Sequence, residues 1–142
     1  MKFNNVNLKK SHEFLKRAED LIPALSQTFS KAHYSYVSGV YPTYLKSGKG
    51  SHVFDVDDNE YIDYVLGLLP VSLGYCDYDV DMAVIKQVNK GSIFSMPSKL
   101  ETELAEKLIE IIPSAEMVRY GKNGSDVTTA AIRLARAYTG KD

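Results

Sequence analysis

The segment of residues 117–142 constrains the fold of this chain more than any other. An apolar run over residues 116–120 leads into the small-residue turn of residues 121–125, and a helical pattern follows at once. The apolar positions that recur at helical spacing are Val127, Ala131, Leu134, Ala135 and Tyr138. This order predicts a strand over residues 118–121, then a turn, and then a helix over about residues 125–138.

The predicted turn has the geometry of an anion site. The first N–H groups of a helix lack partners within the helix, and the helix dipole places positive charge at the same end. Asn123, Gly124 and Ser125 stand at that end, where a phosphate commonly binds. Gly124 lets the backbone come close to the anion, and Ser125 can donate its hydroxyl or cap the helix. The alternative interpretation is that these three residues only cap a helix.

The amino-acid sequence of this segment resembles that of a known family. The sequence Asn-Gly-Ser-Asp at residues 123–126 precedes an Ala/Arg-rich helix and Thr-Gly-Lys-Asp at residues 139–142. This pattern is similar to the cofactor-phosphate segment of class III pyridoxal-phosphate aminotransferases, most of all the glutamate-1-semialdehyde aminomutase branch. The resemblance covers about residues 40–142. The other segments that carry it are residues 47–50, 53–64, 73–75 and 101–106.

The resemblance implies an α/β fold, the amino-terminal part of the fold-type I transferase fold. Residues 1–73 are expected to form a small α+β subdomain with a β-hairpin, and residues 74–142 the start of the large cofactor-binding α/β domain. The implied cofactor is pyridoxal 5'-phosphate, with Asn123, Gly124 and Ser125 in its phosphate site. The implied activity is transfer of an amino group between a small-molecule amino donor and a carbonyl substrate, by a homodimeric transaminase or aminomutase.

The chain has no counterpart of the family's catalytic residues. In the family, the aromatic residue that stacks on the cofactor, the Asp paired with its ring nitrogen and the Schiff-base Lys all follow the phosphate segment. We therefore expect an amino-terminal portion that contributes no catalytic residue and is inactive in isolation. Two alternatives stay open: a stand-alone phosphate- or nucleotide-binding domain, and a non-catalytic interaction domain whose turn is a helix cap.

One departure from the aminomutase branch concerns the substrate. That branch has a Ser-Pro-Val-Arg segment ahead of the hairpin, whose arginine holds the substrate carboxylate by a bidentate pair. The comparable region here, residues 34–42, contains no arginine. This difference favours a transaminase that acts on another carbonyl compound, such as a keto-sugar or a small metabolite.

The remaining elements are predicted from periodicity and from residues that begin or end helices. Residues 30–50 show no clear period and are expected to be irregular. The other expected elements are a helix over about residues 8–21, a β-hairpin over residues 53–64, a helix from Asp77 or Asp79 to about Asn89, and a helix from a capping box of Ser98 and Glu101 to Pro113.

Composition excludes several classes of function. Charged residues make up 25% of the chain and the formal net charge is −1, which argues against a nucleic-acid or acidic-membrane partner. No segment has the length of a signal peptide's apolar core or of a membrane span. The single cysteine, Cys76, suits a reducing compartment, so we expect a cytoplasmic protein. The three histidines are scattered, so we expect no metal site.

Overall fold

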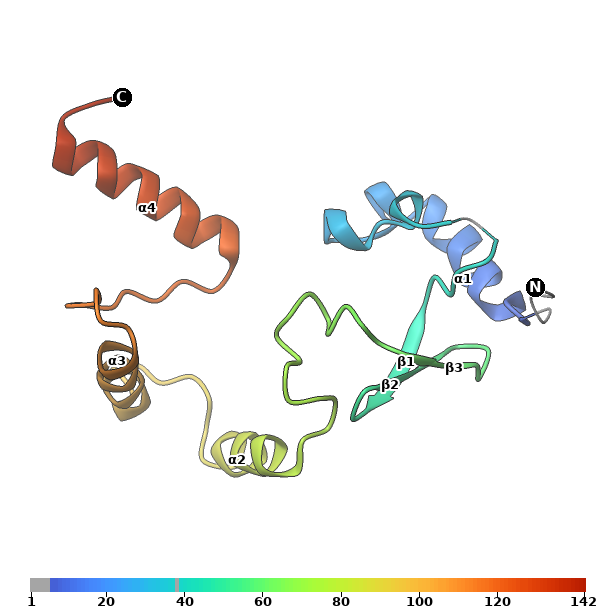
Figure 1. Ribbon diagram of the computed structural model, residues 1–142, viewed down its shortest axis with the longest axis horizontal. Helices are drawn as coiled ribbons and strands as arrows, with labels where there is room; N and C mark the ends of the chain where they lie inside the picture. The colour runs from blue at the N-terminus through green and yellow to red at the C-terminus, as the bar shows by residue number, and fades with distance from the viewer. Residues whose placement is uncertain (1–5, 38) are drawn as a thin grey trace. The chain divides into compact units, whose positions relative to one another are not determined.

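A computed structural model of the chain describes residues 6–37 and 39–142. Residues 1–5, on which the expectation about a signal-peptide core falls, and residue 38 lie outside the described part. The chain divides into two compact units, one that ends at Lys90 and one that spans Gly91–Asp142. Figure 1 traces the elements of both units along the chain.

The first unit begins with α1, Lys9–Glu19, which confirms the helix predicted over about residues 8–21. Three short 3-10 turns follow, η1 at Pro23–Leu25, η2 at Phe29–Lys31 and η3 at His33–Ser35. Lys16 and Arg17 lie in the last turn of α1, where positive charge is favoured by the helix dipole.

The sheet of the first unit has three antiparallel strands in the order β1-β2-β3. They are β1 at Leu45–Lys49, β2 at His52–Asp55 and β3 at Glu60–Ile62. The strands β2 and β3 confirm the predicted hairpin. The expectation of an irregular segment up to residue 50 was wrong for β1. This strand has no apolar alternation and forms because its backbone pairs with β2, a neighbour that periodicity along β1 does not reveal.

Tyr75 is fixed against the turn between β1 and β2. The N–H of Tyr75 donates to the carbonyl of Gly50 and the N–H of Gly50 donates to that of Tyr75, both at 2.8 Å. The Tyr75 ring lies on the backbone of Gly48, where a β-carbon would come within 2.5 Å of the ring. Gly48 is therefore required by this packing.

Two further helices begin as the sequence predicts. In the first unit, α2 spans Tyr78–Val88, and the side chain of its N-cap Asp77 accepts from the N–H of Val80 at 3.1 Å. In the second unit, α3 spans Lys99–Ile111 and starts with the expected capping box. The N–H of Ser98 donates to Glu101 Oε1 at 3.0 Å, and Ser98 Oγ accepts from the N–H of Leu100 at 3.3 Å.

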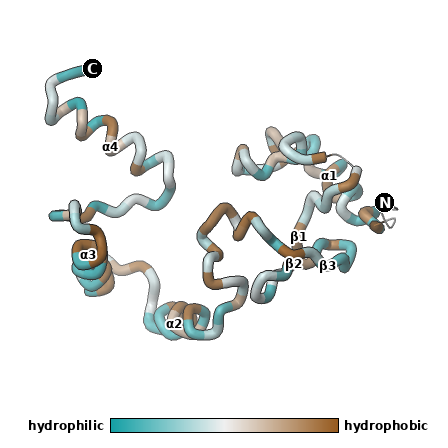
Figure 2. Tube along the Cα trace, viewed as in Figure 1, coloured by the Kyte–Doolittle hydropathy of each residue, from teal (hydrophilic) through white to brown (hydrophobic). Residues whose placement is uncertain are grey.

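The helices that follow the sheet carry hydrophobic residues among hydrophilic ones along their length (Figure 2). Many of these hydrophobic side chains are exposed. Exposed apolar side chains of α2 include Val80, Val84 and Val88. Because amphipathic helices derive most of their stability from packing of the apolar face, these faces are suited to a covering layer. Among the described residues, no helix is both long and apolar enough to cross a membrane.

Candidate functional site

The turn singled out in the sequence leads into α4, Gly124–Thr139, the last helix of the second unit. The predicted helix over about residues 125–138 is thus confirmed, with its first residue one position earlier. Gly140 ends the helix in the left-handed conformation at φ 65°, and its N–H donates to the carbonyl of Arg136 at 2.9 Å.

The strand predicted over residues 118–121 is absent from the structure, so that prediction was wrong. A strand needs a neighbour whose backbone groups pair with its own. The three described strands all belong to the other unit. Residues 118–121 instead approach α3, where the Tyr120 hydroxyl donates to the carbonyl of Glu101 at 2.8 Å. The helix α4 begins only at Gly124, so residues 121–123 form the predicted non-helical connection to it.

Asn123 is the N-cap residue of α4 and has an extended conformation at φ −122° and ψ 156°. Its carbonyl accepts from the N–H groups of Asp126 and Val127, both at 3.2 Å. Its side chain makes no capping bond, and its Nδ2 donates to Asp126 Oδ2 at 3.2 Å. Within residues 6–37 and 39–142, the N–H groups of Gly124 and Ser125 have no acceptor.

The two glycines of this turn have opposite surroundings. A β-carbon at Gly121 would lie 2.5 Å from Val127 Cγ1, so the first turn of α4 rests directly on the Gly121 backbone. A β-carbon at Gly124 would meet nothing within 4 Å, so the space beside the free N–H groups is open. The Ser125 side chain is exposed within the first turn. The packing role of Gly121 was not predicted, although its position before the helix was visible.

A cavity of about 520 Å³ in the first unit was not predicted from the sequence. Its lining includes Lys31, Tyr36, Tyr41, Thr43, Tyr61, Asp63, Val65, Leu68 and Tyr75. The rings of Tyr36 and Tyr41 stack with centroids 4.1 Å apart and planes 3° from parallel. We refer to it as the tyrosine-lined cavity. Single tyrosines spread over residues 36–75 give no periodic signal, and only the fold brings them together.

Asp63 and Tyr75 form the strongest polar contact of this cavity. The Tyr75 hydroxyl donates to Asp63 Oδ2 at 2.6 Å, and Asp63 Oδ1 accepts from the N–H groups of Val65 and Leu66 at 2.8 and 3.2 Å. The hydrogen bond from Tyr75 lowers the pKa of Asp63, and hydrogen bonds from backbone N–H groups lower it further. Together they outweigh desolvation, which acts to raise this pKa. The same bond, with desolvation, raises the pKa of Tyr75 to about 12.

The rim of the cavity has an unusual backbone. Leu66, Leu68 and Leu69 all have positive φ, at 53°, 70° and 80°. Residues with a β-carbon pay roughly 1–2 kcal/mol each for this conformation, and such strain tends to gather at functional sites. Leucines give no sequence signal for it.

The family model for class III aminotransferases matches residues 34–142. The chain is 44% identical over 132 residues to a glutamate-1-semialdehyde 2,1-aminomutase of Natranaerobius thermophilus, covering 93% of this chain and 30% of that protein. It is 42% identical over 137 residues to a 3-aminobutyryl-CoA aminotransferase of Cloacimonas acidaminovorans, covering 96% of this chain and 33% of that protein.

Solved structures agree with this assignment. An omega-transaminase from Sphaerobacter thermophilus superposes with a TM-score of 0.82 at 33% identity, over 92% of this chain and 28% of that one. Other matching structures are a transaminase with PLP bound and the PLP internal aldimine form of the FumI protein of Sphingopyxis sp. MTA144. The chain spans about 30% of the length of the relatives it matches. It belongs to the class III aminotransferase family.

Proposed function

We propose that the complete protein transfers an amino group from a small-molecule amino donor to a carbonyl substrate, and that this chain supplies part of its cofactor-phosphate site. The site is formed by Asn123, Gly124 and Ser125. The observation that supports it is the pair of N–H groups at Gly124 and Ser125 that point out of α4 without an acceptor in the described chain.

The residues present fit a phosphate group. Two backbone N–H groups and the Ser125 hydroxyl are donors, and the positive end of the α4 dipole adds to them. The open side of Gly124 leaves room for the anion. Asp126 would repel a phosphate, but its carboxylate is engaged by the Asn123 amide. When bound, the cofactor supplies the electron sink for amino transfer, and these residues hold and orient its phosphate.

The proposal extends to organisation and location. Residues 1–73 form the small subdomain and residues 74–142 begin the large one; the complete enzyme is a cytoplasmic homodimer. The exposed free thiol of Cys76 is compatible with a reducing compartment. Light scattering coupled to gel filtration tests the dimer, and cell fractionation tests the location.

The substrate is proposed to differ from glutamate 1-semialdehyde, because residues 34–42 lack the arginine of the aminomutase segment. The experiment is an activity panel of the complete protein with added cofactor. Its amino compounds include glutamate 1-semialdehyde and 3-aminobutyryl-CoA, with 2-oxoglutarate and pyruvate as acceptors. We expect transamination of at least one amino donor and no aminomutase activity.

Two results would contradict the proposal. Conversion of glutamate 1-semialdehyde to 5-aminolevulinate would show that the protein is an aminomutase. Binding of inorganic phosphate, with no change in the absorption spectrum of added pyridoxal phosphate that would mark a Schiff base, would instead favour a stand-alone phosphate-binding domain.

A further inference from the structure

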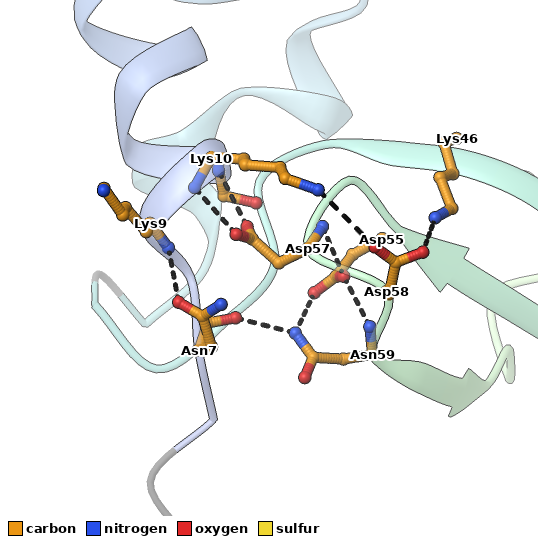
Figure 3. A network of polar contacts seen from close by, with 9 residues as sticks. Asn7, Lys9, Lys10, Lys46, Asp55, Asp57, Asp58 and Asn59 are labelled. Carbon is orange, nitrogen blue, oxygen red and sulfur yellow. Dashed lines mark hydrogen bonds and ion pairs between the residues drawn. The ribbon is translucent and has the colours of Figure 1, made fainter.

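The first helix of the chain is capped by a side chain far from it in sequence. The N-cap residue of α1 is Leu8, which makes no side-chain capping bond. Asp57, in the turn between β2 and β3, takes that role (Figure 3). Its Oδ1 accepts from the N–H of Lys10 at 2.7 Å, and its Oδ2 accepts from the N–H of Ser11 at 2.8 Å. Asp57 is only 9% exposed; its bond to Ser11 is buried and its bond to Lys10 is partly buried.

The turn that carries Asp57 is itself held rigidly. The fully buried Asp55 accepts from the N–H groups of Asp57 and Asn59 at 2.9 and 2.8 Å through Oδ1. Its Oδ2 accepts from Asn59 Nδ2 at 2.7 Å and from the Tyr61 hydroxyl at 3.1 Å. Asn59 Nδ2 also donates to the carbonyl of Asn7 at 2.7 Å. The turn therefore bonds to the start of α1 through Asp57 and to the residues before it through Asn59.

The helix held in this way backs one wall of the tyrosine-lined cavity. We call residues 33–37 and 39–43 the wall segment. His12 and Leu15 of α1 share a small second cavity with Tyr41 of the wall segment, and Tyr41 also lines the tyrosine-lined cavity. The Phe14 ring lies 5.6 Å from that of Tyr44. Movement of α1 would thus remove support from the wall.

We propose that Asp57 is a positioning residue for the tyrosine-lined cavity. By capping α1, it holds the helix behind the wall segment and so sets the shape of the cavity.

Two features make a carboxylate suited to this task. Both of its oxygens accept a bond, whereas an amide offers only one acceptor oxygen for the same two N–H groups. Its negative charge is also stabilised by the positive end of the helix dipole. Burial raises the pKa of Asp57, but the N–H groups of Lys10 and Ser11 outweigh it and leave that pKa lowered. Asp57 is therefore ionised at neutral pH.

The test is hydrogen exchange of the complete protein with its cofactor. In Asp57→Ala we expect amide exchange to become at least tenfold faster both in α1 and in the wall segment, and to stay unchanged in α4. Asp57→Asn, which keeps one acceptor, should give an intermediate effect. If the wall segment keeps its wild-type exchange while α1 is released, Asp57 is a helix cap only and the proposal is wrong.

Asp58→Asn is the matched control. Asp58 is the next residue, and its backbone has a positive φ of 71°, a conformation that asparagine tolerates. Its side chain is 70% exposed, and its ion pairs to Lys10 and Lys46 lie on the surface. Surface ion pairs contribute little to stability, so exchange in both segments should match the wild type. Should Asp57→Ala fail to fold, Lys10→Pro removes one of the two donated N–H groups from the helix side, at a first-turn position where proline is tolerated.

Discussion

Val127 rests on the backbone of Gly121, so closely that a β-carbon on Gly121 would lie 2.5 Å from Val127 Cγ1. This contact sets the angle at which the chain enters α4, and with it the direction of the free N–H groups of Gly124 and Ser125. The position of the proposed phosphate site thus depends on a residue that does not touch the phosphate.

The first prediction concerns this contact. Gly121→Ala forces Val127 or the turn to move, so we expect a loss of stability of roughly 1–3 kcal/mol together with weaker cofactor binding. Gly124→Ala is the comparison, because its β-carbon meets no protein atom but enters the space proposed for the phosphate. It should weaken cofactor binding with little change in apo stability. Urea unfolding of the apo protein and cofactor titration measure both; equal stability losses in the two variants would speak against this assignment.

The second prediction concerns Ser125. Its side chain makes no hydrogen bond among the described residues, so Ser125→Ala should leave folding nearly unchanged. Loss of a charge-assisted bond to the phosphate should weaken cofactor binding by roughly 1.5–3 kcal/mol, or about ten- to a hundredfold. Cofactor titration and thermal melts of the complete protein decide the matter. Unchanged cofactor affinity with a clear loss of apo stability would mean that Ser125 stabilises the start of the helix and does not bind the phosphate.

The third prediction concerns residues 1–142 on their own. They should show no transamination with any donor, because that chemistry needs a positioned lysine amine and a partner for the cofactor ring. No lysine here lies in a segment that resembles the family's catalytic-lysine context. Borohydride reduction followed by peptide mapping is the check. A stoichiometric cofactor adduct on one specific lysine would overturn this expectation.

The fourth prediction concerns the hydrogen bond between Tyr75 and Asp63. Tyr75→Phe keeps the ring on Gly48 but removes the hydroxyl, so at pH 7 we expect a loss of about 1 kcal/mol. The pKa of Asp63 is lowered in the folded protein, so its contribution is present above the unfolded pKa and disappears as pH falls through the folded value. The stability gap between wild type and variant should therefore shrink below about pH 4.

The same bond has an alkaline counterpart. The pKa of Tyr75 is raised to about 12, so its contribution is complete below the ordinary tyrosine pKa and is lost as pH rises through the folded value. Urea unfolding of wild type and Tyr75→Phe across pH measures both the acid and the alkaline change in their stability difference. Tyr64→Phe is the control, since Tyr64 is 87% exposed and donates no hydrogen bond within the described chain. A gap that stays constant from pH 7 to pH 3 would contradict the role of Asp63.

Local signals predicted the elements that depend on local interactions. The capping box of Ser98 and Glu101 and the cap at Asp77 each involve residues within three positions, and both helices formed as expected. The start of α4 also followed from its turn and stripe. What could not be predicted depends on distant partners. The strand β1 needs β2, the absent strand over residues 118–121 lacks a neighbour, and the cap of α1 comes from Asp57, 47 positions beyond Lys10.

Leu68 combines a strained backbone conformation with a place in the lining of the cavity. Glycine at position 68 would relax the backbone, whose φ is 70°, and on conformational grounds alone would stabilise the protein. Leu68, however, supplies part of the apolar lining of the cavity. Leu68→Gly would therefore exchange part of the cavity's apolar lining for a relaxed backbone, so a higher melting temperature in this variant would come with a changed cavity.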